Sequence, residues 1–232
     1  MIKKFGLFFI VFFIVIAFAV SGYYIEQKSE TTSPQGSKTT ITKIWFNPSM
    51  LRTDSGDNIT VINYQDNTVL IVNKQNKTYS TLDMAKFKQM TGMIINMLKQ
   101  FSKDKNSGIT VTVTGERKVI DGYKCYKVLT DIYGMKSESW ISKDISIPKD
   151  LYVKSYEMML PDEDLKKLLN NPEFKKIEGF PVESTQTASF MGQSSVTKTK
   201  LIRFKKMAIP LSVFKIDLTG YQKKSLNMMG GK

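Results

Sequence analysis

The side chains that could carry out chemistry in this chain are few, and their types limit that chemistry. The 232 residues include no histidine and one cysteine, Cys125. Without histidine, Ser-His-Asp and Cys-His catalysis and imidazole zinc sites are excluded. Cys125 could serve as a redox thiol, but it has no second cysteine to pair with, which favours a small buried hydrophobic side chain. We therefore expect a protein that is not an enzyme and that has no metal site and no cofactor.

A run of three acidic residues is the other local group that could do chemistry. Asp162, Glu163 and Asp164 follow Pro161 directly. They could form a metal site or an acid–base pair. Carboxylates are also common in the first turn of a helix, where they interact favourably with the positive end of the helix dipole. The position after a proline favours this second interpretation.

Methionine is unusually frequent, with 13 residues in the chain. Several lie between residues 84 and 97, and others stand in pairs at 158–159 and 228–229. Flexible thioether side chains suit an adaptable apolar pocket, but they also fill gaps in an ordinary core. Both interpretations remain open.

The chain is basic, with a formal net charge of +13. Its densest basic stretch lies between Lys198 and Lys206, and strand alternation would place positive charge on both faces. This pattern suits an edge strand protected from aggregation, and it would also suit contact with acidic lipid head groups. An anionic membrane surface is therefore one partner that the composition allows.

The amino-terminal segment determines where the protein is expected to work. Lys3 and Lys4 precede an uncharged apolar run from Phe5 to Val20, which is typical of an export signal. Residues 1–22 are expected to be a signal peptide, or alternatively an N-terminal membrane anchor. We therefore expect the protein in the periplasm, or anchored in the inner membrane facing the periplasm, and we expect no nucleic acid as partner.

The rest of the chain reads as one domain. Residues 23–38 are polar and contain Pro34 and Gly36, which predicts a linker; residues 39–222 form the domain, and residues 223–232 form a tail. Turn signals such as Asp121-Gly122 separate short alternating segments, which predicts an antiparallel meander. Strands are predicted at 39–46, 50–53, 59–64, 68–73, 77–82, 109–114, 116–120, 123–133, from 134 onward, 182–191 and 194–206.

Three segments are predicted to be helical. The longest covers residues 83–102, where apolar residues recur at helical spacing. Its stripe is expected to lie against the sheet and consists of Met84, Phe87, Thr91, Ile94, Leu98 and Phe101, widened by Met90, Ile95 and Met97. Residues 149–159 fit a helix slightly better than a strand, and residues 161–172 predict a short helix.

Several pieces of the chain resemble known families. The stretch from Lys43 to Arg52 (KIWFNPSMLR), a strand with an Asp66-Asn67 turn, and Asn73 to Ser80 are similar to the N-terminal half of LolA-like lipoprotein carriers. Three later pieces resemble an uncharacterised family of exported bacterial proteins that is marginally similar to LolA. These are residues 120–127 (IDGYKCYK), 138–143 (ESWISK) and 214–221 (FKIDLTGY).

The resemblance implies an α+β fold in which an antiparallel, incomplete, half-open β-barrel wraps over helices. In the LolA-like relatives the concavity of the barrel accepts lipid chains, and an arginine matching Arg52 links the barrel to its lid. We therefore expect Arg52 to make a lid contact and the concavity to bind a lipid acyl chain or another apolar ligand. The expected cavity-lining residues are Trp45, Phe87, Met90, Ile94, Met97, Leu98 and Phe101.

An alternative function uses the same architecture. The concavity could be filled by the methionine-rich helix itself, which would make the chain a structural or interaction protein whose partner is another protein of the cell envelope. The sequence does not discriminate between the two, and it indicates no oligomeric state.

Overall fold

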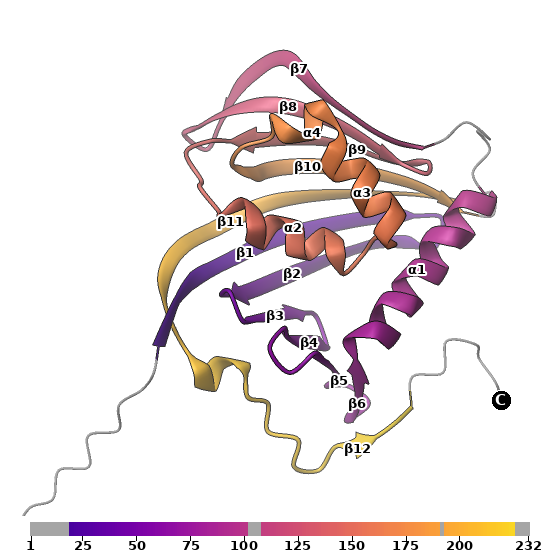
Figure 1. The fold of residues 1–232 in the computed structure, drawn as a ribbon, viewed down its shortest axis with the longest axis vertical. Coiled ribbons are helices and arrows are strands. Elements are labelled where there is room, and N and C mark those ends of the chain that lie inside the picture. Colours follow the sequence, from indigo (N-terminus) through magenta and orange to yellow (C-terminus); the bar gives the residue numbers. More distant parts are fainter. Residues whose placement is uncertain (1–18, 102–107, 191–192, 226–232) are drawn as a thin grey trace, which may run out of the picture.

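The computed structural model describes residues 19–101, 108–190 and 193–225. This part of the chain is mostly β, with 56% strand and few helices. All the strands join one open, curled sheet of twelve strands (Figure 1). The strands are β1 (Ala19–Ser33), β2 (Gly36–Phe46), β3 (Met50–Ser55), β4 (Asn58–Asn63), β5 (Thr68–Asn73), β6 (Thr78–Asp83), β7 (Ile109–Ile120), β8 (Tyr123–Ile132), β9 (Met135–Ser142), β10 (Phe180–Phe190), β11 (Gln193–Pro210) and β12 (Gln222–Lys223).

The strand order is β12-β6-β5-β4-β3-β2-β1-β11-β10-β9-β8-β7. Neighbours pair in antiparallel fashion, apart from β12, which pairs with β6 in parallel. The sheet is thus two meanders, β2–β6 and β7–β11, joined by β1. The turns follow their sequence signals: Asp121 and Gly122 both have positive φ (49° and 87°), as a two-residue hairpin turn of type I′ requires.

The expectation of a linker at residues 23–38 is wrong. These residues form most of β1 and the start of β2, and β1 pairs along its length with both β2 and β11. Tyr23 and Ile25 are buried. The polar residues after them are strand residues whose side chains pair across the sheet, for example Thr31 with Thr197 (3.0 Å). The polar composition of this segment therefore reflects a solvent-exposed strand and not an unstructured linker.

At both ends, the sheet includes residues outside the domain limits predicted from the sequence. Ala19–Gly22, at the end of the expected leader, belong to β1, whereas residues 1–18 lie outside the described residues. Lys223, the first residue of the expected tail, belongs to β12. The rest of that tail from residue 226 also lies outside the described part.

The long helix α1 (Met84–Phe101) is confirmed. Most of its expected stripe is buried or half-buried, but Ile94 and Met97 are exposed. The side chain of Asp83 caps it by accepting a hydrogen bond from the backbone N–H of Lys86 (2.7 Å). Ile95 is 4% exposed, whereas Ile94 is 50% and Met97 45% exposed. The expected stripe followed a repeat near 3.5 residues, and a straight α-helix repeats every 3.6, so the buried line drifts from position 94 to position 95.

Three further helices lie on the same side of the sheet as α1 (Figure 1). They are α2 (Lys149–Glu157), α3 (Asp162–Asn170) and α4 (Pro172–Lys175). The buried residues Leu160, Leu168 and Phe174 pack with Val128 and Ile141 of the sheet. A short 3-10 helix, η1 (Leu211–Phe214), follows β11. Across the described ranges, no helix combines the length and apolar character needed to span a bilayer.

Candidate functional site

An apolar cavity of about 280 Å³ lies between the helices and strands β7–β10; we call it the helix–sheet cavity. Its size is close to the lower limit of typical ligand pockets. The strands contribute one wall and the ends of α2, α3 and α4 the other. Its main apolar lining residues are Val111, Val128, Ile132, Ile141, Leu168 and Phe174.

Aromatic side chains form the helix side of this cavity. Tyr156 packs edge-on against both Tyr152 and Phe174, with ring centroids 5.3 and 5.6 Å apart. The hydroxyl groups of Tyr152 and Tyr156 lie 3.2 Å apart and hydrogen bond to one another. Burial raises the pKa of Tyr152 well above its ordinary value, so this phenol stays neutral. The helix side of the cavity is therefore largely aromatic and uncharged.

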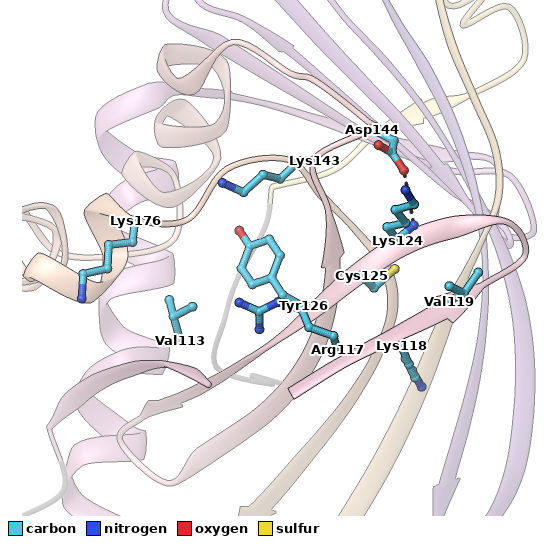
Figure 2. Close-up of a pocket in the computed structure, with 10 residues that line it drawn as sticks. All are labelled: Val113, Arg117, Lys118, Val119, Lys124, Cys125, Tyr126, Lys143, Asp144 and Lys176. Atoms are coloured by element: carbon cyan, nitrogen blue, oxygen red, sulfur yellow. Dashed lines mark hydrogen bonds between the residues drawn. The ribbon is translucent and has the colours of Figure 1, made fainter. Parts of the chain in front are cut away.

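A second hollow of about 810 Å³ lies beside the β7–β8 hairpin; we call it the basic groove (Figure 2). The lining of the groove includes one carboxylate, that of Asp144, and five cationic side chains. The cations are those of Arg117, Lys118, Lys124, Lys143 and Lys176.

A bulge in β7 positions Arg117. Pairing with β8 shifts between Val113 and Arg117, so three residues of β7 stand opposite one residue of β8. A bulge of this kind bends a strand and redirects the side chains that follow it. Nη1 of Arg117 donates to the carbonyl oxygens of Thr114 (2.9 Å) and Glu116 (2.8 Å), which holds the guanidinium against the bulge.

The ring of Tyr126 forms the floor beneath Arg117. The guanidinium carbon lies 5.6 Å from the ring centroid. The buried Tyr126 hydroxyl donates to the carbonyl oxygen of Glu178 (2.8 Å) and accepts from its N–H (2.9 Å), so the ring is held in place. The next residue, Gly179, lets this backbone lie close to the end of β9, because its φ is +102° and a Cβ there would collide with the carbonyl group of Ser142.

The basic groove and the helix–sheet cavity adjoin one another. A smaller hollow of about 330 Å³ lies between them. Lys143 lines both this hollow and the groove, whereas Tyr152 and Ile177 line both the hollow and the helix–sheet cavity. The segment from α4 to Gly179 therefore lies between a space lined by charged side chains and one whose lining carries no charge.

The structure places Arg52 where it joins two parts of the chain. Its Nη1 donates to the carbonyl oxygen of Val213 in η1 (2.6 Å), and Nε and Nη2 donate to the two carboxylate oxygens of Asp54 (2.6 Å each). The guanidinium also lies over the ring of Trp45, 5.2 Å from its centroid. Arg52 and Trp45 are neighbours beside η1, away from the helix–sheet cavity.

The other residues expected to line a cavity lie on α1. Of those whose side chains the structure describes, none lines the helix–sheet cavity. Phe87 packs with Ile62, Val69 and Met158. Leu98 packs on the cluster beneath α3, and Met90 is half-buried. Ile94 and Met97 are exposed. Phe101 ends α1, and its side chain lies outside the described part.

Two further residues resolve questions left by the sequence. Cys125 is buried, and burial raises the pKa of its thiol, which disfavours the reactive thiolate. Asp164 does more than interact with the dipole of α3. It is 1% exposed, and its carboxylate accepts hydrogen bonds from Lys99 of α1 (2.6 Å) and from the hydroxyl of Tyr133. No local signal separates it from Asp162, which is exposed.

The groove residues were not expected from the sequence either. Arg117, Tyr126 and Lys143 stand on three different segments, and nothing in their local sequence indicates that they meet. The bulge that positions Arg117 has a weak signal in Gly115, which interrupts the alternation of β7.

Residues 28–218 match the family described as "Domain of unknown function (DUF4412)". The chain belongs to the DUF4412 family. The resemblance to an uncharacterised family that the sequence indicated is thereby confirmed. No protein of curated function matches the chain.

Two solved structures are similar to this DUF4412 protein over most of its length. An uncharacterised conserved protein from Thermus thermophilus is similar over 88% of this chain and 90% of its own, with a TM-score of 0.50 and 10% identity. The LolA superfamily protein NE2245 from Nitrosomonas europaea is similar over 84% of this chain and 90% of its own, with a TM-score of 0.33 and 8% identity. At 10% identity, the similarity to the Thermus thermophilus protein concerns the fold alone.

Proposed function

We propose that this protein is an exported, non-catalytic binding protein of the bacterial cell envelope that holds a lipid acyl chain or a similar apolar ligand. The curled sheet would then act as a half-open barrel around its helices. The helix–sheet cavity is the observation that carries the proposal, because its lining is mostly apolar, carries no charged side chain and lies between two layers of the fold.

The energetics of such a cavity suit an acyl chain. Each buried methylene contributes about 0.8 kcal/mol, so a chain of about ten carbons would gain roughly 8 kcal/mol before the costs of ordering are subtracted. Micromolar binding needs about 8 kcal/mol, so the ligand would have to fill the cavity or extend beyond it. The flexible side chain of Met159, which lines the cavity and is exposed, would allow that extension.

The location in the envelope is supported by the basic, apolar start of the chain, which is typical of an export signal. Fractionation of cells that express the full chain tests it. The protein is expected with the periplasm if the leader is cleaved and with the inner membrane if it is retained. Recovery in the cytoplasm would contradict the proposal.

Native mass spectrometry of the protein purified from its own envelope tests for the ligand. We expect a co-purifying apolar molecule, or a mass shift after addition of a fatty acid or phospholipid. If both were missing, the alternative would be favoured: an envelope protein that fills its own core and interacts with another protein.

A substitution within the cavity locates the ligand. Ser139→Phe would place a ring in the helix–sheet cavity and is expected to weaken binding at least about tenfold by occupying the ligand's space. Ser194→Phe, at an exposed position of β11, is the matched control and should leave binding unchanged. Equal binding by both variants would place the ligand elsewhere.

A further inference from the structure

We propose that the basic groove binds the anionic head group, a phosphate or a carboxylate, of a single-chain amphiphile whose hydrocarbon chain enters the helix–sheet cavity. This inference rests on the proposed function and adds to it the charge of the ligand. Arg117 and Lys143, on either side of Tyr126, would hold the head group (Figure 2).

The guanidinium of Arg117 is prepared for an anion. Its Nη1 is occupied by the two carbonyl oxygens of the bulge. Among the residues that the structure describes, its Nε and Nη2 have no hydrogen-bond partner and Arg117 forms no ion pair. The nearest acidic neighbour in sequence, Glu116, pairs with Lys127 instead (2.7 Å). This free edge matches the spacing of two oxygens of a phosphate or carboxylate.

The surroundings hold Arg117 in this orientation. The ring of Tyr126 lies beneath the guanidinium, and its hydroxyl is fixed by two hydrogen bonds to the backbone of Glu178. The side chain therefore loses less freedom when it binds an anion than an unrestrained arginine would.

The lysines of the groove can contribute without losing essential contacts. Lys143 pairs with Glu178 (2.7 Å), and Lys176 pairs with Glu173. The Lys143 and Glu178 side chains are 63% and 66% exposed, and exposed pairs of this kind contribute little to stability. A bound anion could therefore replace the carboxylate partner of Lys143 at small cost.

The charge of Arg117 acts on Lys143 across the groove. The hydrogen bond to Glu178 raises the pKa of Lys143, while the positive charge of Arg117 opposes that rise. An anion bound between two cations attracts both and so offsets their electrostatic repulsion. Without a bound anion, this repulsion between Arg117 and Lys143 is not offset.

The neighbouring apolar space determines which anion fits. The hollow between them shares Lys143 with the groove, and Tyr152 and Ile177 with the helix–sheet cavity, so only these side chains stand between the two spaces. A free inorganic anion would use the cations alone. An amphiphile would use the cations and the apolar walls together, and so should bind more tightly than either part of it.

Binding of three probes to the full chain tests the proposal: dodecyl phosphate, dodecanol and inorganic phosphate, measured by isothermal titration calorimetry. Dodecyl phosphate is expected to bind at least about tenfold more tightly than dodecanol, because charged hydrogen bonds are worth roughly that factor. Its advantage should decrease with added sodium chloride, since the groove is exposed to solvent.

Variants of Arg117 assign the effect to the groove. Arg117→Ala should remove most of the advantage of dodecyl phosphate and leave dodecanol binding unchanged. Arg117→Lys, which keeps the charge but lacks the two-pronged edge, should retain part of it. Lys205→Ala removes one exposed charge on β11, outside the groove, and should change neither affinity. Unchanged thermal unfolding of each variant shows that the fold is kept.

The outcomes separate this inference from the proposed function. If dodecanol and dodecyl phosphate bind equally, or Arg117→Ala affects both alike, the head-group site is wrong while the apolar cavity stands. If neither binds, the proposed function fails and the inference fails with it. If inorganic phosphate binds as tightly as dodecyl phosphate, the groove is a site for a free anion, and the amphiphile is excluded.

Discussion

At the scale of single residues, neighbours in the sequence have opposite surroundings in this fold. Ile94 and Ile95 are chemically identical, yet one is half exposed and the other is buried against the cluster that contains Tyr126 and Leu168. Asp162 and Asp164 differ in the same way at the start of α3. The contributions of these pairs to stability should therefore differ strongly.

The two isoleucines of α1 provide a matched pair of variants. Ile95→Ala should lower the free energy of unfolding by about 3 kcal/mol, because it leaves a cavity in the core. Ile94→Ala should change it by less than about 0.5 kcal/mol, since its side chain is already in contact with water. Urea unfolding followed by circular dichroism measures both. Similar losses would mean that the burial assigned to α1 is wrong.

Asp164 should stabilise the fold through its buried ion pair. Burial alone would raise the pKa of this carboxyl group, but the hydrogen bonds from Lys99 and Tyr133 outweigh it, so the pKa lies below its usual value of 3.8. Asp164→Asn should therefore cost about 2 kcal/mol near neutral pH.

The pH dependence of that loss has a definite sign. A carboxyl group with a lowered pKa in the folded state stabilises the protein fully above its ordinary pKa, and this contribution is lost as pH falls through the folded value. The difference in unfolding free energy between the natural protein and Asp164→Asn should thus shrink below about pH 3.8. A difference that stays constant from pH 7 to pH 3 would show that the pair is not ionised.

At the scale of elements, β1 holds the sheet together. It pairs with β2 on one side and β11 on the other, and so joins the two meanders. Its buried residues Tyr23 and Ile25 belong to a cluster that also contains Cys125, Trp140 and Leu201. Within each meander, neighbouring strands are close in sequence. The pair β1–β11 is different, because most of the chain lies between these two strands.

Truncation tests this role of β1. A chain that begins at Ala19 should fold, whereas one that begins at Thr39 should lose the cooperative unfolding transition, because the sheet would open at its centre and expose its core. Circular dichroism with urea titration measures both. If the shorter chain unfolded at the same midpoint, residues 19–38 would be a dispensable linker after all.

At the scale of the whole molecule, one continuous sheet should make unfolding a single event. Trp45 in β2 and Trp140 in β9 stand on opposite sides of β1 in the strand order. The core cluster that contains Trp140 also includes Phe46 of β2, so the two meanders share buried contacts. A break in either meander would therefore uncover residues of the other.

Two single-tryptophan variants measure this coupling. Trp45→Phe leaves Trp140 as the fluorescent probe, and Trp140→Phe leaves Trp45. In each variant, the urea transition seen by fluorescence should coincide with the one seen by circular dichroism, as expected for a cooperative unit. Different midpoints within either variant would show that the two halves of the sheet unfold separately.

The local elements of this protein follow from its sequence alone. The turns at Asp66-Asn67 and Asp121-Gly122, the strands between them and the helix that begins after Asp83 depend on neighbouring residues, so their signals are present in short segments. The absence of histidine likewise limits the catalytic chemistry without reference to any fold.

Only the tertiary structure decided which surfaces these elements share. The strand character of residues 26–33 depends on pairing with β11, and polar side chains gave no local sign of it. The basic groove exists because a bulge in β7, a tyrosine of β8 and the backbone after α4 meet at one point. Such meetings depend on long-range pairing and packing energies, which no single stretch of sequence contains.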